Sequence, residues 1–453
     1  MGRLFGTDGV RGIANTELTP ERAMAIGRAA ALVLSREDIR TKVLIGTDTR
    51  KSSDMLAAAV AAGLTSVGAD VVLLGVVPTP AVAYLVTKLQ ADAGIMISAS
   101  HNPFAFNGIK IFSSDGFKLP DLLEEQIESL VLDGESSFPS PTGNGVGRIV
   151  AQPELLSLYI SHLKGTVGDS LAGIRIALDC ANGSASVMAE ALFSALGAEV
   201  HMLSHTPDGV NINEDCGSTH PEALSAYVRE HGLSGGAAFD GDADRCLLVD
   251  ENGSLIDGDH ILSVIGLDMK ERGTLTGNTI VGTVMTNFGF HRFCEENGIR
   301  FVETKVGDRF VLEEMVREEY ALGGEQSGHI IFREFATTGD GQLTALQMFA
   351  LLARSGKSLS ALAARMVSCP QELVNLRVSG EGKLRFYTDA AVKAAIEDAR
   401  GMLGGRGRIV VRPSGTEPLI RVMAEGDDGA AIRRAVEMVA EVIARRLTPA
   451  DDR

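Results

Sequence analysis

Apolar and polar positions follow one another along the chain in three similar blocks. Each block has an apolar run typical of a buried strand, a segment with helical spacing of apolar residues, a second such pair, and a third apolar run that ends in a polar loop. The first block begins with a strand over Lys42–Asp48 and a helix over Ser53–Ala69. Strands that alternate with helices predict a mostly parallel sheet with helices on both faces. Because ligands bind at the carboxyl ends of such strands, the final loops near residues 100, 240 and 325 are candidate functional segments.

The last part of the chain departs from this pattern. It predicts a strand at Leu376–Gly380, a helix at Ala390–Met402, a strand at Arg408–Glu425 and a final helix at Ala430–Arg446. We therefore expect an α/β protein with three related α/β domains, whose mixed sheets are mostly parallel, and a smaller C-terminal α+β domain, all around a central cleft. The expected domains are 1–150, 151–256, 257–370 and 371–453.

Composition and charge narrow the class of protein. A chain of 453 residues, 45% hydrophobic and 22% charged, is expected to be soluble and is too long for a single core. Its five cysteines form no CxxC pair, which indicates reduced thiols and a cytoplasmic protein. No apolar run approaches membrane-spanning length. A formal net charge of −17 argues against nucleic acid or an anionic membrane as partner, so an anionic substrate would need a local basic cluster.

The loop of the first block carries a candidate nucleophile. Ser100 follows the apolar run Gly94–Ile97, and Pro103 keeps the loop from becoming a helix. A serine on a rigid loop after a strand suits nucleophilic or phosphoryl-carrying chemistry. Taken alone, such a segment would more simply be a turn that ends a strand. The other loops favour the functional interpretation.

The loop of the second block is acidic at every other position. Carboxylates spaced in this way, here Asp240, Asp242 and Asp244, can converge on one hard cation such as Mg²⁺. An EF-hand is the competing interpretation, since Glu251 falls at its twelfth position. It is disfavoured because Arg245 stands where that loop needs glycine and because the flanking segments are strands. A purely structural turn would leave the carboxylates to repel one another, so we predict a metal site.

The loop of the third block and a loop near the C-terminus complete the set. Glu325 and Ser327, two residues apart, suit hydrogen bonding to adjacent sugar hydroxyls, although a solvated glycine-rich turn explains this motif equally well. Near the C-terminus, Arg412 and Arg421 flank a Ser-Gly-Thr turn. Its hydroxyls and backbone N–H groups can cradle a phosphate dianion.

Together these motifs resemble one family, the α-D-phosphohexomutases, and within it the branch of bacterial phosphoglucosamine mutases. The resemblance spans nearly the whole chain, in the family order, through Phe5–Gly12, Ile97–Pro103, Asp240–Arg245, Gly323–His329 and Arg412–Pro418. The GTDGVRG start and Gln326 resemble the sequences of the phosphoglucosamine mutase branch. Phosphomannomutase/phosphoglucomutase relatives tend to carry Met at the position of Gln326.

The resemblance implies reversible conversion of glucosamine 6-phosphate to glucosamine 1-phosphate, which supplies UDP-N-acetylglucosamine and peptidoglycan precursors. It implies one Mg²⁺ per chain, a hexosamine 1,6-bisphosphate as intermediate and activator, and sugar phosphates as small-molecule partners. Members of the family often form homodimers, whereas the residues alone do not specify an oligomeric state.

Roles for individual residues follow from their places in the family motifs. Ser100 would carry the phosphate and hold Mg²⁺ together with Asp240, Asp242 and Asp244, while Glu325 and Ser327 would bind sugar hydroxyls. The phosphate that does not react would be held by Arg412, Ser414, Gly415, Thr416 and Arg421, and the transfer site would be lined by Arg11, Lys110 and Arg245. The general base is left open among His101, Lys110 and His329; we prefer Lys110 or His329, with His101 orienting the serine loop.

Three alternatives stay open on the residues alone. A phosphomannomutase or phosphoglucomutase of the same superfamily would share every motif. A metal-dependent sugar phosphatase could share the serine and the acidic loop, but would have less need of a second phosphate cradle. A non-catalytic sugar-phosphate-binding protein would not need Ser100 to be phosphorylated.

Overall fold

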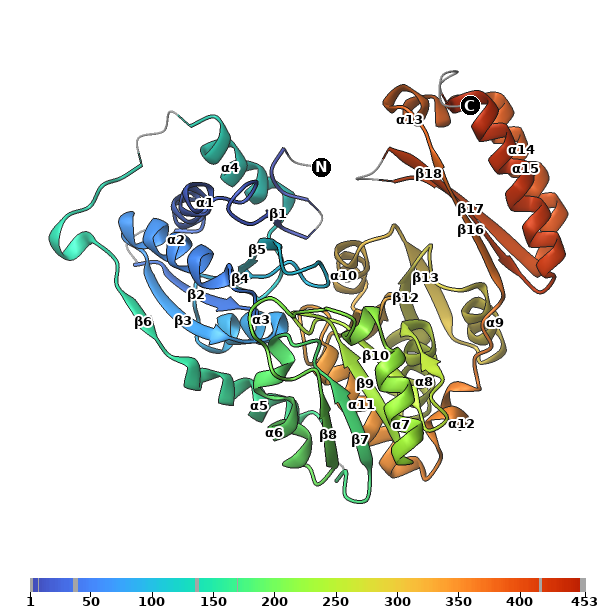
Figure 1. The fold of residues 1–453 in the computed structure, drawn as a ribbon, viewed down its shortest axis with the longest axis horizontal. Helices are drawn as coiled ribbons and strands as arrows, with labels where there is room; N and C mark the ends of the chain where they lie inside the picture. The colour runs from blue at the N-terminus through green and yellow to red at the C-terminus, as the bar shows by residue number, and fades with distance from the viewer. Residues whose placement is uncertain are drawn as a thin grey trace. The chain divides into compact units, whose positions relative to one another are not determined.

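The computed structural model describes residues 3–6, 8–35, 40–134, 138–168, 170–414 and 418–448. Figure 1 shows its helices and strands along the chain. The chain divides into two compact units. One comprises Met1–Thr283 with Val302–Ala364, and the other comprises Val284–Phe301 with Arg365–Arg453. Within the described residues, no helix is long and apolar enough to cross a membrane.

Three of the four sheets share one strand order, which confirms the internal repeat. The first sheet has the order β1 (Val10–Ile13), β5 (Phe106–Ser113), β4 (Ala93–Ile97), β2 (Lys42–Thr47), β3 (Asp70–Val76) and β6 (Ile149–Ala151). The second has the order β11 (Leu255–Ile256), β10 (Cys246–Asp250), β9 (Gly235–Phe239), β7 (Arg175–Asp179) and β8 (Glu199–Leu203). The third has the order β13 (Arg300–Thr304), β12 (Thr279–Thr283), β14 (Leu322–Gly324) and β15 (Ile330–Phe332).

The shared order explains where the three polar loops lie. In each sheet the first strand of the repeat pairs in parallel with the third, as β2 does with β4, β7 with β9 and β12 with β14. The strand after the polar loop then returns antiparallel to the third, as in β4–β5, β9–β10 and β14–β15. Each polar loop is therefore a short reversal at the carboxyl end of a buried strand.

Helices flank these sheets. The helices of the larger unit are α1 (Pro20–Val33), α2 (Ser53–Ser66), α3 (Thr79–Lys88), α4 (Asp121–Leu132), α5 (Leu156–Gly165), α6 (Ala189–Ser194), α7 (Glu222–His231), α8 (Gly258–Glu271), α10 (Asp308–Arg317), α11 (Gly341–Ser355) and α12 (Leu359–Ala363), whereas α9 (Phe288–Glu296) belongs to the smaller unit. The predicted helix Ser53–Ala69 ends earlier, at Ser66, because Gly68 takes a φ of 100° that a right-handed helix does not allow. Helices α1 and α2 pack closely, since a side chain at Gly27 or Gly63 would collide with the backbone of the facing helix.

The smaller unit has its own sheet and core. Its antiparallel strands β16 (Gln371–Arg377), β18 (Leu419–Gly426) and β17 (Gly407–Pro413) lie in that order. Its further helices are α13 (Gly380–Phe386), α14 (Ala390–Leu403) and α15 (Gly429–Leu447). The core includes Val392, Val422, Val436 and Ile443, all fully buried.

Two sequence predictions for this unit were wrong in detail. The predicted single strand Arg408–Glu425 is a hairpin of β17 and β18, closed where Ser414 N donates to Leu419 O at 2.8 Å. The predicted strand Leu376–Gly380 lies earlier, because Ser379 caps a helix by accepting a hydrogen bond from Gly382 N at 3.0 Å.

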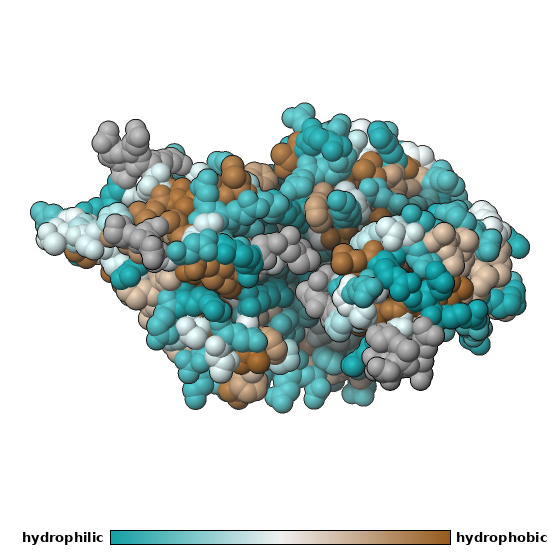
Figure 2. Space-filling model, turned by 90° about the horizontal axis from the view of Figure 1, so that it is seen from above, coloured by the Kyte–Doolittle hydropathy of each residue, from teal (hydrophilic) through white to brown (hydrophobic). Residues whose placement is uncertain are grey.

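On the face seen in Figure 2, hydrophilic and hydrophobic residues are interspersed. Large apolar side chains are exposed at several described positions, among them Leu122, Val367 and Leu384. Exposed apolar residues of this kind are ordinary on protein surfaces.

Candidate active site

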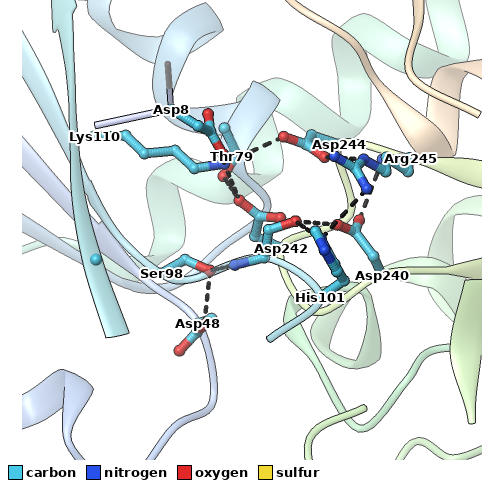
Figure 3. Close-up of polar contacts among 12 residues, drawn as sticks. Asp8, Asp48, Thr79, Ser98, His101, Lys110, Asp240, Asp242, Asp244 and Arg245 are labelled. Atoms are coloured by element: carbon cyan, nitrogen blue, oxygen red, sulfur yellow. Dashed lines mark hydrogen bonds and ion pairs between the residues drawn. The ribbon is translucent and has the colours of Figure 1, made fainter. Parts of the chain in front are cut away.

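The three aspartates of the acidic loop form one buried cluster. Asp240, Asp242 and Asp244 each offer a carboxylate oxygen, and these oxygens lie within 4.8 Å of one another. The loop joins β9 to β10, so both flanks are strands. An EF-hand needs two helices there, and that interpretation is therefore excluded. Figure 3 shows the three carboxylates side by side.

The cluster fits a divalent cation. The Oδ1 atoms of Asp242 and Asp244 are buried and have no hydrogen-bond partner among the described residues. Burial, followed by the negative charges of Asp244 and Asp242, raises the pKa of Asp240 to about 8. Buried carboxylates this close lose stability unless a positive charge offsets their repulsion. Lys110 offsets part of this repulsion, and an oxygen-ligated ion such as Mg²⁺ would offset the rest.

Ser100 lies directly at this cluster, at the start of the loop between β4 and β5. Its side chain is buried, and its hydroxyl donates to Asp240 Oδ2 at 2.6 Å. Its backbone has a φ of 53°, in the left-handed region that residues other than glycine rarely adopt. The structure thus places the predicted nucleophile against the first of the predicted metal ligands.

His101 contacts the same hydroxyl. Its Nδ1 lies 3.3 Å from Ser100 Oγ and 3.3 Å from an NH1 donor of Arg245. Burial, then the charges of Arg245 and Arg11, lower the pKa of His101 to about 4. His101 is therefore neutral near neutral pH, with Nδ1 as the acceptor for Arg245.

Lys110, on β5, is buried among carboxylates. Its Nζ lies 2.8 Å from Asp242 Oδ2, 3.2 Å from Asp244 Oδ2 and 3.2 Å from Asp8 Oδ2. Although burial alone would lower it, these three charges hold the pKa of Lys110 well above its usual range. In this arrangement Lys110 is a fixed cation beside the acidic loop.

From Lys110 the charged side chains continue into a closed ring that His329 completes. Asp8 Oδ1 accepts from Lys118 Nζ at 2.6 Å, and Lys118 Nζ donates to Asp308 Oδ2 at 2.5 Å. His329 lies between the next two acids, with Nε2 at 3.5 Å from Asp308 Oδ2 and Nδ1 at 3.8 Å from Asp244 Oδ1. Because Gly339 N donates to His329 Nε2 at 3.0 Å, the ring proton belongs on Nδ1, facing Asp244. The ring joins residues from all three repeats.

Two arginines in this region each have an N–H donor without a hydrogen-bond acceptor in the part of the chain that the structure describes. The Nε atoms of Arg11 and Arg245 are buried and have no hydrogen-bond partner among the described residues. Arg11 also pairs with Asp8 through its terminal nitrogen. Buried guanidinium N–H groups without a hydrogen bond are costly, and an anion such as a phosphate group would accept from them.

The loop between β14 and β15 holds the predicted sugar-binding pair. Glu325 is largely buried and its Oε1 accepts from Gly307 N at 3.2 Å, whereas Ser327 is exposed. Burial raises the pKa of Glu325. Gln326 donates to Asp257 Oδ2 at 3.3 Å.

The predicted phosphate cradle lies in the smaller unit. Arg412 on β17 and Arg421 on β18 are directly paired in the hairpin. Burial, then the charge of Arg421, lowers the pKa of Arg412. Two like charges held side by side suit a doubly charged anion. Ser414 is buried, while Gly415 and Thr416 lie outside the described residues.

Sequence reasoning missed several residues of the site. Asp8 stands inside the quoted motif Phe5–Gly12, where its charge was a usable signal. Lys118 and Asp308 carried no such signal, because only the fold brings them to Asp8. Thr79 was missed as well. Its hydroxyl donates to Asp242 Oδ2 at 2.5 Å and its backbone N–H donates to Asp242 O at 2.9 Å.

These two bonds hold Asp242 from the first turn of α3, so Thr79→Val should weaken metal binding. We expect about tenfold lower affinity for Mn²⁺, measured by electron paramagnetic resonance, because a group that orients a metal ligand is typically worth that much. Thr79→Ser keeps the hydroxyl and should bind Mn²⁺ as wild type does. Thr65→Val, which removes a buried hydroxyl bonded to Ala61 O, controls for loss of a buried threonine. Equal affinity in Thr79→Val and wild type would contradict this role.

Comparison with known proteins identifies the family. Domain families described as phosphoglucomutase/phosphomannomutase alpha/beta/alpha domains I, II and III match residues 2–137, 157–253 and 257–369. The C-terminal domain of the same series matches residues 373–442. The chain therefore belongs to the phosphoglucomutase/phosphomannomutase family, which confirms both the resemblance and the predicted fold class.

Within this family, the chain is similar over nearly its whole length to curated phosphoglucosamine mutases. The phosphoglucosamine mutase of Acetivibrio thermocellus is 52% identical over 449 residues, covering 99% of this chain and 100% of the relative. The phosphoglucosamine mutase of Symbiobacterium thermophilum is 53% identical with the same coverage.

Solved structures share the fold. A phosphoglucomutase/phosphomannomutase family protein from Burkholderia thailandensis has a TM-score of 0.83 at 24% identity, covering 98% of each chain. The N-acetylphosphoglucosamine mutase of Aspergillus fumigatus, in complex with GlcNAc-6P and magnesium, has a TM-score of 0.68 at 17% identity. That match covers 99% of this chain and 96% of the fungal one.

Proposed function

We propose that this chain interconverts glucosamine 6-phosphate and glucosamine 1-phosphate through a phosphorylated Ser100 and a 1,6-bisphosphate intermediate. One observation carries the proposal. The Ser100 hydroxyl lies 2.6 Å from Asp240 within a buried acidic cluster, in a chain about half identical, end to end, to curated phosphoglucosamine mutases. A serine beside a cation site is suited to carry a phosphoryl group between two oxygens of one sugar.

We propose Mg²⁺ as the cofactor, held by Asp240, Asp242, Asp244 and the phosphate on Ser100. When bound, the ion would offset negative charge on the phosphoryl group as it moves. Two buried carboxylate oxygens without a hydrogen bond to any described residue, and the magnesium in the complex of the fungal protein, support this assignment. The hexosamine 1,6-bisphosphate, as intermediate and activator, is proposed on the family resemblance.

The chain's own residues would do the rest of the transfer. The bond between Ser100 Oγ and phosphorus breaks as phosphorus bonds to a sugar hydroxyl oxygen, which loses its proton to a base, while Ser100 Oγ regains one. Arg11, Lys110 and Arg245 would attract the phosphoryl oxygens, and fixed positive charges of this kind stabilise such transfers without reorganisation. The base stays a prediction, with Lys110 or His329 preferred from the sequence. The surrounding carboxylates hold the pKa of Lys110 well above its usual range, which keeps it protonated and disfavours it as the base. His101, neutral and bonded to Arg245, is suited to orient the serine loop.

The remaining assignments concern substrate and assembly. Glu325 and Ser327 would bind sugar hydroxyls, and the second phosphate would be held by Arg412, Ser414, Gly415, Thr416 and Arg421. A homodimer, a cytoplasmic location and the boundaries between the four domains stay predictions.

If Arg421 binds the phosphate that does not react, Arg421→Ala should mainly raise KM. Uniform binding of that phosphate stabilises ground state and transition state alike, so kcat should change little. We expect KM to rise by about tenfold or more, since a charge-assisted hydrogen bond contributes roughly 1.5–3 kcal/mol. Arg400→Ala, which removes an exposed arginine paired with Glu397, is the control in the same unit. A loss confined to kcat would contradict the assignment.

The proposed function is tested by ³¹P NMR with Mg²⁺ and a trace of hexose 1,6-bisphosphate. Glucosamine 6-phosphate, glucose 6-phosphate and mannose 6-phosphate are supplied in parallel. We expect the 1-phosphate signal to appear fastest from glucosamine 6-phosphate. Faster conversion of glucose or mannose phosphate would indicate a phosphoglucomutase or phosphomannomutase instead. Inorganic phosphate as the main product would indicate a phosphatase.

A further inference from the structure

Behind the Ser100 loop lies a buried arginine that the proposed chemistry does not use. Arg50 follows β2 and is 2% exposed, which places it among the largest fully buried side chains. It pairs with Asp48, and both side chains are 0% exposed. A buried guanidinium is retained only where its donors are satisfied, so its partners indicate what it holds.

All five N–H donors of Arg50 have acceptors. Its Nε donates to Asp48 Oδ2 at 2.8 Å, and the other four donors reach main-chain carbonyls of the serine loop and of the first residue of β5. The NH2 group donates to Ser100 O at 2.9 Å and Asn102 O at 2.7 Å. The NH1 group donates to Pro103 O at 2.5 Å and Phe106 O at 3.1 Å. One planar guanidinium group therefore binds four carbonyls within the seven residues Ser100–Phe106.

Asp48 holds the other side of the same loop. Its Oδ2 accepts from the Ser98 hydroxyl at 2.7 Å, and Ser98 Oγ in turn accepts from Ser100 N at 3.0 Å. The Asp48–Arg50 pair thus reaches both the N–H and the C=O of Ser100. The two bonds fix the peptide groups on either side of the nucleophile.

A residue of the second repeat contacts the same carbonyls. Asn213 Nδ2 donates to Ser100 O at 2.9 Å and to Asn102 O at 3.1 Å. Ser100 O consequently accepts from both Arg50 and Asn213, one from each of two repeats. The left-handed φ of Ser100 is unfavourable for serine, and it persists only where surrounding contacts impose it.

We propose that Arg50, with Asn213, is a positioning residue that holds Ser100 in its left-handed conformation and so aims Oγ at Asp240 and the transferring phosphoryl group. The inference rests on the proposed function, because it assigns Arg50 a part in the reaction of Ser100. Arg50 touches no reacting atom. Its effect reaches the reaction through the loop backbone, in a chemistry that depends on in-line placement of the phosphorus.

The test uses Arg50→Lys, which keeps the charge but cannot supply five donors in a plane. Phosphoenzyme is prepared with glucose 1,6-bisphosphate, and transfer to glucosamine 1-phosphate is followed in a single turnover. We expect transfer and kcat to fall about 10²-fold, the loss typical of a small misplacement, with KM within about twofold of wild type. Inorganic phosphate released per mutase turnover should rise, because hydrolysis does not need the sugar hydroxyl in line. Loss of stability alone would not move that ratio.

Asn213→Ala is the second variant, chosen because its side chain is only half-buried and its loss threatens folding less. We expect a drop in transfer rate of about tenfold with KM unchanged. Arg28→Lys, an arginine of α1 bonded to Ser66, is the control and should transfer at the wild-type rate.

The outcomes separate the two proposals. A folded Arg50→Lys protein that transfers as wild type does would overturn the positioning role. If Arg50→Lys does not fold, wild-type transfer by Asn213→Ala would overturn it instead. Absence of phosphoserine in the wild-type protein would count against the proposed function itself, whatever the variants do.

Discussion

Ser100→Ala is expected to abolish mutase turnover, with a loss of about 10⁴-fold or more in kcat. In the proposed reaction every phosphoryl group passes through Ser100 Oγ, and alanine has no oxygen to carry it. The fold should survive, because the lost hydroxyl makes one strong contact, to Asp240, and contributes little packing. Steady-state kinetics and intact-protein mass measure both effects. The wild-type protein should carry one added phosphoryl group that the variant lacks.

Ser98→Ala provides the matched comparison in the same loop. It removes a buried hydroxyl that bonds Asp48 and supports Ser100 N, but no oxygen that would carry phosphate. We expect it to retain phosphorylation and measurable turnover. If Ser100→Ala kept wild-type turnover, or if phosphate were found on another residue, the assignment of Ser100 would be wrong.

Asp242→Asn should have the second largest effect. The substitution removes one negative charge from the cluster, in which Asp242 Oδ1 is buried without a hydrogen-bond partner among the described residues, and it leaves Lys110 and Thr79 facing an amide. We expect at least about tenfold weaker Mn²⁺ binding and a loss of about 10³-fold in kcat/KM, since metal stabilisation of a transferring phosphoryl group amounts to several kcal/mol. Isothermal titration with Mn²⁺ and kinetics at saturating Mg²⁺ separate binding from catalysis.

Asp250→Asn is the control for this variant. Asp250 is also a buried aspartate of the same hairpin, but its carboxylate accepts from the backbone of Asn252 and Ser254 and has no place in the metal cluster. It should leave Mn²⁺ affinity unchanged. Equal Mn²⁺ affinity in Asp242→Asn and wild type would remove Asp242 from the metal site.

Much of the architecture could be predicted because local patterns determine it. Strong alternation of apolar strands and helices indicated the three repeats, and the strands that flank the acidic loop ruled out an EF-hand. The structure then places Ser100 against Asp240, as the resemblance implied. The wrong predictions concerned where strands begin and end in the smaller unit, because only a few residues of sequence indicate each of these boundaries. The hairpin of β17 and β18 looked like one strand because few residues separate its two strand-forming segments in the sequence.

The rest of the site depends on contacts that no local pattern encodes. Lys118 and Asp308 lie 190 positions apart and meet only because the first and third repeats pack together. Arg50 looked like an ordinary charged residue after a strand, and its burial becomes visible only when four carbonyls converge on it. Long-range hydrogen bonds of this kind are set by topology.

A single-turnover experiment with isotopically labelled phosphate tests the central claim most directly. Unlabelled phosphoenzyme is mixed with an equal amount of glucosamine 6-phosphate whose phosphate carries ¹⁸O. The account predicts that the first glucosamine 1-phosphate carries the unlabelled phosphate from the protein and that the label ends on Ser100. Labelled glucosamine 1-phosphate with Ser100 still unlabelled would contradict transfer through the serine.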